Sequence, residues 1–278
     1  METLEKDNAK LVLYRDASDW DGPAMAVAKF RFPSVEAGAA VLQEAAELAR
    51  AAGAKGIVGP MEGDTWHAYR VVSESDGRAP FLMEPTSGRH DLAALEAAGF
   101  NRIGSYFSAT VPLAEVARPV PEARNGLMVN AWDGSDPEAL FTEVHRLSCE
   151  AFRSNPFYKD IALDNFLAMY MPVVPLLKRE LILFARNETG ALVGFLFGIP
   201  NYAEGPAPAS AILKTYASLQ KGAGFALSSR FYAAAQALGH TTAIHALMHD
   251  DNLSALRSAA NGAEVFRRYA LMGKRLDR

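Results

Sequence analysis

The stretch Lys221-Gly222-Ala223-Gly224-Phe225-Ala226 lies between two segments with different hydrophobic patterns. The apolar segment before it, residues 211–217, is typical of a buried strand. The alanine-rich segment after it, from Phe225 to about Leu238, predicts a helix, and Gly239 is the residue expected to end that helix. The sequence therefore predicts a strand, a tight glycine turn and a helix in succession.

This succession of elements is suited to binding an anion. The first turn of a helix has unpaired N–H donors and the positive end of the helix dipole. Gly222 and Gly224 lack the Cβ atoms that would keep a phosphate away from the backbone, and Lys221 adds a positive charge. The pattern favours a pyrophosphate group as the ligand. The alternative is an ordinary strand-to-helix turn that uses glycine for its shape.

Composition limits the function classes. The chain of 278 residues is half hydrophobic and suits two modest domains or one large one. Its net charge of −4 argues against a nucleic-acid surface, which needs a basic stripe. The single cysteine, Cys149, excludes an internal disulfide, so the reducing cytoplasm is the expected location. The charged N-terminus and the short, proline-interrupted apolar run at 166–177 predict no signal peptide and no membrane span.

The hydrophobic periodicity predicts two mixed α/β halves. In the first half we expect strands at 11–14, 24–32, 56–60 and 103–111, and helices at 35–52, with Ser34 as its N-cap, and at 91–98. Residues 61–85 are less regular. The prolines between 112 and 125 indicate a linker, so we place the domains at 1–118 and 127–278, with the linker at 119–126.

The second half is predicted to open with a strand at 127–132 and a helix at 136–152, capped by Ser135 or Asp136. A helical segment at 163–177 should be bent or broken by its prolines. A hairpin, the glycine turn and its helix come next. The remaining elements are a strand at 243–248, a helix to Ala260 and a strand at 267–274.

The two halves resemble each other in sequence. Residues 37–61 can be laid on 223–247 without a gap, at an offset of 186 (223 − 37), which predicts a duplication. A chance match of two alanine-rich helices is the alternative. The first half has Val35 and Glu36 where the second has Lys221 and Gly222, and a carboxylate is unsuited to a phosphate site. We therefore expect one ligand site, in the second half, and a degenerate first half.

The order of elements from residue 127 onward resembles the GNAT acyltransferase superfamily. The stretch from Lys221 to Ala226 is similar to its acyl-CoA signature, Arg/Gln-x-x-Gly-x-Gly/Ala, and Asn252-Leu253-Ser254-Ala255 is similar to the Asn-x-x-Ala that begins the last helix of that family. The whole chain resembles bacterial tandem GNAT proteins, in which a degenerate half precedes a competent one. The resemblance implies an α/β fold of two tandem domains, each with a central, mostly antiparallel sheet flanked by helices.

The resemblance also implies acetyl-CoA or another acyl-CoA as cofactor, and no metal. In this family the strands on either side of the signature helix separate, and the pantetheine arm lies between them. The implied cofactor-binding residues are Thr215, Tyr216, Ala217, Lys221, Gly222, Ala223, Gly224, Phe225, Ala226 and Asn252. A backbone N–H near Ala217 would stabilise the oxyanion while an amine attacks the thioester directly.

The acid position of this sequence departs from the family pattern. The tyrosine that often protonates the leaving thiolate in this family falls on Ser258, a poor proton donor. Tyr269 or Tyr216 could replace it, or solvent could act. His245, on the strand expected to face the cofactor groove, is the candidate base, although a strand histidine is more often packed and hydrogen-bonded.

Four residues are candidates for binding the acceptor. The irregular segment at 61–85 is an insertion relative to the second half, since the offset between the halves falls from 186 before it to 161 (253 − 92) after it. It carries Trp66, Tyr69 and Arg70, which could form a wall over the acceptor site with Arg70 holding a carboxylate. The alternative is interface packing by the two aromatic residues and a structural ion pair of Arg70. Tyr202, after the hairpin, could line the same site or belong to a surface loop.

Three functions remain open from the sequence. The first is an acyl-CoA-dependent N-acyltransferase, expected to transfer acetyl to a small amine or amino-acid-like acceptor. The second, suggested by Ser258, is a catalytically silent acyl-CoA-binding or sensor protein. The third is an aminoacyl-tRNA-dependent transferase on the same scaffold, which the acidic pI near 5.9 and the glycine turn disfavour. Whether two chains pair as a homodimer is left open.

Overall fold

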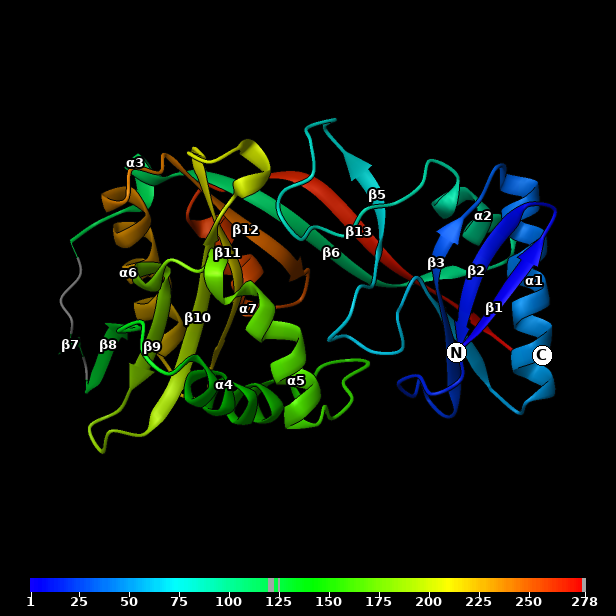
Figure 1. The fold of residues 1–278 in the computed structure, drawn as a ribbon. Helices are drawn as coiled ribbons and strands as arrows, with labels where there is room; N and C mark the ends of the chain where they lie inside the picture. Colours follow the sequence, from blue (N-terminus) through cyan, green and yellow to red (C-terminus); the bar gives the residue numbers. More distant parts are fainter. Residues whose placement is uncertain (120–122, 125, 277–278) are drawn as a thin grey trace. The chain divides into compact units, whose positions relative to one another are not determined.

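The computed structural model describes residues 1–119, 123–124 and 126–276, and these form two compact units (Figure 1). The first unit contains Met1–Phe107, Asn155–Lys159 and the described residues from Arg267. The second contains the described residues of Ser108–Ser154 and Asp160–Phe266. The end of the chain therefore packs in the same unit as its beginning. Part of the predicted linker, residues 120–122 and 125, lies outside the described residues, and the predicted domain boundaries remain a prediction.

The first unit is a mixed sheet with helices packed against it. Its strands follow the order β1 (Glu2–Lys6), β2 (Ala9–Tyr14), β3 (Ala24–Arg31), β4 (Gly56–Gly59) and β13 (Glu264–Arg275), and β5 (Val71–Ser75) also pairs with β13. Its helices are α1 (Val35–Ala51) and α2 (Asp91–Ala97), and β6 (Asn101–Pro112) begins in this unit. Helix α1 buries a stripe of residues at helical spacing, which includes Val41, Leu42, Ala45, Ala46 and Ala49.

The second unit has its strands in the order β12 (Thr242–His249), β11 (Ser210–Ser218), β10 (Leu192–Pro200), β9 (Ile182–Arg186), β8 (Leu127–Ala131) and β7 (Ala123–Arg124). Its helices are α3 (Leu113–Val116), α4 (Pro137–Phe152), α5 (Leu163–Tyr170), α6 (Ala223–Ala237) and α7 (Leu253–Ala260). Short 3₁₀ turns, η1 (Met171–Leu176), η2 (Arg179–Leu181) and η3 (Tyr202–Glu204), complete it.

Helices cover both faces of this second sheet. On one face of β10, the ring of Phe197 lies 5.6 Å from that of Phe141 in α4. On the other face, Gly194 and Gly198 leave the space that Leu227 and Phe231 of α6 fill. Because side chains alternate across a strand, the glycines let α6 pack closely on the sheet. Helix α6 is thereby packed closely on the face of β10.

The structure repeats the duplication that the sequence predicts. In the first unit β3 and β4 pair in parallel from Ala24↔Gly56, and in the second β11 and β12 pair in parallel from Ser210↔Thr242. Both pairs are related by the offset of 186 (210 − 24 and 242 − 56). A helix, α1 or α6, connects the two strands in each case. The same strand–helix–strand unit is therefore present twice in the same register.

The predicted α/β class is confirmed, with differences in detail. Strands β1 and β5 were not predicted, and the helix expected at 163–177 ends at Tyr170, where a proline-containing 3₁₀ turn replaces it. Ser34 caps α1 as expected, since its Oγ accepts a hydrogen bond of 3.2 Å from the N–H of Ala37. Asp136, rather than Ser135, caps α4.

Candidate functional site

Strands β11 and β12 separate halfway along their length. Their parallel pairing runs from Ser210↔Thr242 to Leu213↔His245, although β11 continues to Ser218 and β12 to His249. At the same point Lys214 is left out of the register between β11 and β10, because Leu213 pairs with Gly198 and Thr215 with Phe197. Such a bulge bends its strand. The predicted separation of these strands is confirmed, and Thr215, Tyr216 and Ala217 lie on the part of β11 that no longer pairs with β12.

The N-terminal end of α6 is open to a ligand. The helix begins at Ala223, two residues before the predicted start, so Gly224 lies in its first turn. Gly222 precedes it with φ of 92°, a left-handed conformation that favours glycine, and no side chain caps the helix. The first turn carries no acidic residue, and Lys221 and Gly222 are exposed. Phe225 is 51% exposed, whereas Ala223 and Ala226 are buried.

Arg257 of α7 reaches this helix end, which the sequence analysis missed. A Cβ built on Gly224 would lie 2.6 Å from Nη1 of Arg257 and 3.2 Å from Cε2 of Tyr216. Among the described residues Arg257 makes no side-chain hydrogen bond or ion pair, so its positive charge is uncompensated there. Helix α7 begins directly after Asn252, as the Asn-x-x-Ala resemblance implied, and Asn252 is exposed at its N-cap. The only sign in the sequence that Arg257 could bind an anion was its basic side chain in this short helix.

His245 lies at the last position of β12 that pairs with β11, inside a buried hydrogen-bond chain. Its Nε2 is 2.8 Å from the hydroxyl of Tyr232, and its Nδ1 is 2.7 Å from Oγ of Ser258. The amide of Asn261 donates to the same Tyr232 hydroxyl at 3.3 Å. Burial lowers the pKa of His245 from 6.5 to about 4, so the ring is neutral at pH 7. Both ring nitrogens are therefore bonded to protein groups, and Ser258 is one of them.

Tyr269, a predicted catalytic residue, lies in the first unit and is fully buried. Its hydroxyl donates to the carboxylate of Glu84. The other oxygen of Glu84 forms an ion pair with Arg267 and accepts the N–H of Phe81 at 2.9 Å. The hydroxyl of Tyr269 thus belongs to a buried polar cluster, which accounts for its position without a catalytic role.

Trp66, Tyr69 and Arg70 also lie in the first unit, but they do not form one cluster. The indole N–H of Trp66 donates to the carbonyl of Lys159 at 2.7 Å. The guanidinium of Arg70 lies 3.9 Å from the ring centre of Tyr69 and 4.1 Å from that of Tyr106.

Arg70 is only 7% exposed, and its guanidinium donates to the hydroxyl of Tyr69. Within the described part of the chain it forms no ion pair, and its buried Nε has no hydrogen-bond partner. The expected structural ion pair of Arg70 is therefore not present there. Two tyrosine rings lie against its charge instead.

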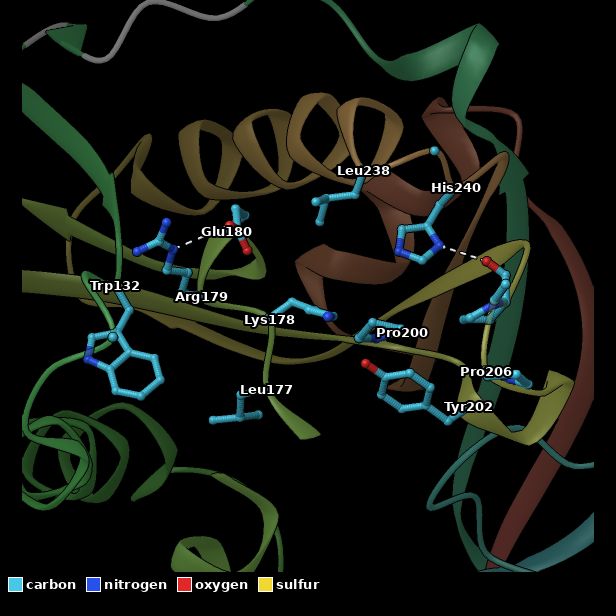
Figure 2. Close-up of a pocket in the computed structure, with 14 residues that line it drawn as sticks. Trp132, Leu177, Lys178, Arg179, Glu180, Pro200, Tyr202, Pro206, Leu238 and His240 are labelled. Carbon is cyan, nitrogen blue, oxygen red and sulfur yellow. Dashed lines mark hydrogen bonds and ion pairs between the residues drawn. The ribbon is translucent and has the colours of Figure 1, made fainter. Parts of the chain in front are cut away.

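Tyr202 lines a pocket at another place in the second unit (Figure 2). This pocket lies where β10 ends and is lined by residues that include Trp132, Lys178 and His240. The unpaired part of β11 begins beyond Leu213, whereas Pro200 at the end of β10 pairs with Ala211. Tyr202 is thus placed near the beginning of β11 rather than beside Thr215–Ala217.

The described residues contain neither a cluster of metal-ligating side chains nor a membrane-spanning helix. No group of three or more His, Cys, Asp or Glu side chains could hold a metal ion in the described part. No helix among residues 1–119, 123–124 and 126–276 is long and apolar enough to cross a membrane.

Comparison with known proteins supports the fold. No protein-family model matches the chain, and no curated protein does. A GCN5-related N-acetyltransferase from Sphaerobacter thermophilus is 15% identical with a TM-score of 0.60, over 96% of this chain and 76% of that one. A tandem GNAT protein from the clavulanic acid biosynthesis pathway is 18% identical with a TM-score of 0.56, over 97% of this chain and 79% of that one.

A third solved structure, a GCN5-related N-acetyltransferase from Anabaena variabilis, is 11% identical with a TM-score of 0.58, over 99% of this chain and 62% of that one. At these identities the likeness concerns the fold. The predicted resemblance is confirmed at that level by matches that extend over nearly the whole chain. This chain has the tandem α/β fold of the GNAT N-acetyltransferases.

Proposed function

We propose that this protein is an acyl-CoA-dependent N-acyltransferase that transfers an acyl group, expected to be acetyl, to a small amine or amino-acid-like acceptor. One observation carries the proposal: β11 and β12 separate after Leu213 and His245, next to a helix whose first turn has no side-chain cap. A separated strand pair offers backbone groups to an amide-containing arm, and an uncapped helix end offers N–H groups to a diphosphate. An acyl-CoA has both chemical parts in one molecule.

The residues at the helix end fit the diphosphate of CoA. The backbone N–H groups of the first turn of α6, together with Lys221 and Arg257, supply donors and positive charge. This arrangement requires glycine at position 224, because the Arg257 guanidinium and the Tyr216 ring occupy the space that a Cβ would fill. The exposed positions of Phe225 and Asn252 allow contact with the rest of the nucleotide.

The unpaired edge of β11 suits the pantetheine arm and the thioester. Residues Thr215–Ala217 keep their pairing to β10 on one edge, so the strand is held rigidly while its other edge has left β12. A backbone N–H near Ala217 is then placed to stabilise negative charge on the thioester oxygen as the amine attacks. Bound acyl-CoA supplies the acyl group for this direct transfer. The role of the chain is to hold both reactants in one geometry.

The proton steps are assigned to residues near the separated strands. Attack needs a neutral amine, and the buried neutral ring of His245, at the last position of β12 that pairs with β11, is the proposed base. Because both ring nitrogens are hydrogen-bonded, His245 would act through Tyr232 or Ser258 rather than by direct contact. Tyr216, on the unpaired part of β11, is the proposed proton donor to the leaving thiolate.

A second candidate is an acyl-CoA-binding protein without transferase activity. It is favoured by the side chains of His245, Ser258 and Tyr269, which are all buried and hydrogen-bonded to other protein groups. None of the three is therefore free to exchange a proton directly with a substrate. Both candidates share the cofactor site and differ only in turnover. The acceptor-binding roles expected for Trp66, Tyr69, Arg70 and Tyr202 stay predictions, and the two candidates differ in whether an acceptor exists.

The decisive experiment measures binding and turnover separately. Calorimetric titration with CoA tests the shared site, and thiol release from acetyl-CoA in the presence of a panel of small amines and amino acids tests the transferase. We expect stoichiometric CoA binding and amine-dependent thiol release. Binding without thiol release on any amine would favour the silent binder, and absence of CoA binding would contradict both candidates.

A further inference from the structure

The pocket that contains Tyr202 is here called the edge pocket, and its volume is about 660 Å³. Its lining comes from the ends of β8, β10 and α6 and from the segments beside them: Trp132, Gly134, Leu177, Lys178, Arg179, Glu180, Pro200, Tyr202, Pro206, Ala207, Pro208, Leu238, Gly239 and His240. This size is typical of small-molecule sites. We propose that the edge pocket binds a small planar carboxylate that also carries a hydrogen-bond donor.

The edge pocket is separate from the proposed cofactor site. It lies at the C-terminal end of α6, where Leu238 and Gly239 line it, whereas the cofactor site is at the N-terminal end of the same helix. A helix of 15 residues separates the two ends by about 22 Å. The four paired positions from Ser210↔Thr242 to Leu213↔His245 close the sheet between them. Occupation of one site therefore does not require the other.

Lys178 and Arg179 bring two positive charges to the edge pocket, and Glu180 brings one negative charge. Arg179 pairs with Glu180 at 3.3 Å, and the positive charge of Lys178 also acts on Glu180. The ammonium of Lys178 has no hydrogen bond or ion pair with any residue that the structure describes. In Figure 2 it points into the middle of the pocket, toward Pro200 and Tyr202. A carboxylate on the ligand would complete this site with a charge-assisted hydrogen bond.

His240 adds a requirement for a donor on the ligand. The side chain is only 8% exposed, and its Nδ1 lies 2.9 Å from the carbonyl oxygen of Pro208. Because a carbonyl only accepts, Nδ1 carries the hydrogen, and Nε2 of the neutral ring is an acceptor. Figure 2 shows Nε2 on the pocket side of the ring, and no residue of the described ranges donates to it. Nε2 is not among the buried unpartnered atoms, so it is accessible from the pocket, and a ligand hydroxyl or N–H can donate to it.

The walls of the edge pocket expose polar and apolar surface in equal measure, and the apolar part fits one flat ring. The indole N–H of Trp132 already donates to the carbonyl of Ser135 at 2.7 Å, so its ring face is what it offers a ligand. Leu177, Pro200 and Leu238 add apolar surface. The hydroxyl of Tyr202 has no hydrogen bond with a described residue and points into the pocket in Figure 2. An aromatic ring with a carboxylate and a donor at opposite ends matches these groups.

The test uses 4-hydroxybenzoate as the probe, titrated by calorimetry into the full chain. Benzoate lacks the donor, and 4-hydroxybenzamide lacks the charge. We expect one equivalent of 4-hydroxybenzoate to bind, each analogue to bind more weakly, and Lys178→Gln to weaken 4-hydroxybenzoate by about tenfold. Arg153→Gln is the control, because it also removes one positive charge, from an exposed position of the same unit. It should leave the affinity for 4-hydroxybenzoate unchanged.

Saturating CoA distinguishes this inference from the proposed function. The probe should bind equally well with and without CoA, and Lys178→Gln should leave CoA affinity unchanged. Absence of probe binding at millimolar concentration would overturn the inference. Equal affinity of wild type and Lys178→Gln, or displacement of the probe by CoA, would also overturn it, because the probe would then lie elsewhere.

Discussion

Replacing Arg257 with glutamine tests the part of the cofactor site that only the structure revealed. The substitution removes the positive charge that lies against Gly224 at the start of α6 and keeps a polar side chain of similar length. The side chain of Arg257 has no ion pair among the described residues, so its loss leaves no buried carboxylate unpaired. We therefore expect a change in ligand affinity with little change in the stability of the fold.

The expected size of the effect follows from the position of Arg257. A charge pair about 4 Å apart is worth about 4 kcal/mol at an effective dielectric constant of about 20. Arg257 is half-buried, so solvent and salt screen part of this energy. A hydrogen bond to a charged group contributes about 1.5–3 kcal/mol. Since about 1.4 kcal/mol corresponds to a factor of ten, CoA should bind about 10- to 100-fold more weakly.

The assay compares ligands that differ in the diphosphate. Calorimetry with dephospho-CoA, which keeps the diphosphate, should show the same loss in Arg257→Gln as CoA does. Pantetheine lacks the diphosphate, so its weak binding should be unchanged by the substitution. Arg153→Gln is the matched control, because Arg153 is exposed in the same unit and makes no side-chain hydrogen bond or ion pair with a described residue.

Two results would refute this reasoning. If Arg257→Gln bound CoA as tightly as wild type, the guanidinium would not contact the ligand. If the substitution weakened pantetheine as much as CoA, it would be acting through the fold of the helix end rather than through the diphosphate. Raising the salt concentration should also reduce the difference between wild type and variant, because ions screen the half-exposed charge.

Three further predictions concern stability. The folded state holds His245 neutral, so its contribution to stability is full above pH 6.5 and is lost as the pH falls toward about 4. The unfolding free energy measured in urea should therefore fall between pH 7.5 and pH 5. This fall should be about 2 kcal/mol larger in wild type than in His245→Gln. Glu84→Gln removes the carboxylate that pairs with the buried Arg267 and should lower the unfolding free energy by about 3–5 kcal/mol in thermal denaturation. The exposed Glu74→Gln should cost less than about 1 kcal/mol. Gly198→Ala places a Cβ against the ring of Phe231 and should destabilise the second unit by about 1–3 kcal/mol, measured by urea unfolding; wild-type stability would contradict the close packing of α6.

Some features of the fold were visible in the sequence because they depend on local chain chemistry. The turn before α6 needs a residue with φ of 92° at position 222. Glycine adopts this conformation readily, so Gly222 predicted the turn. Ser34 predicted the start of α1, because a hydroxyl at the N-cap accepts a hydrogen bond from a free N–H of the first helical turn. The repeat at an offset of 186 predicted two similar strand–helix–strand units, and the parallel register of both follows it.

The hairpin of β1 and β2 was missed although its signal was local. Its turn consists of Asp7 and Asn8, with φ of 51° and 62°, and these two residue types tolerate the left-handed conformation better than others do. Residues Glu2–Lys6 are mostly charged, so they looked like a polar tail. Only Leu4 is buried in that strand. The strand lies at the edge of the sheet and is held by its backbone pairing with β2, so it needs little apolar surface.

The sequence by itself determined where most strands, turns and helices occur, which half retains the glycine turn, and that the chain is a tandem α/β protein. Only the tertiary structure decided which side chains meet. It placed Arg257 against Gly224, enclosed His245 between Tyr232 and Ser258, and joined Glu84 to Arg267 across 183 residues of chain. The physical reason is that local patterns fix backbone conformation within a few residues, whereas contacts between distant side chains exist only after the elements have packed.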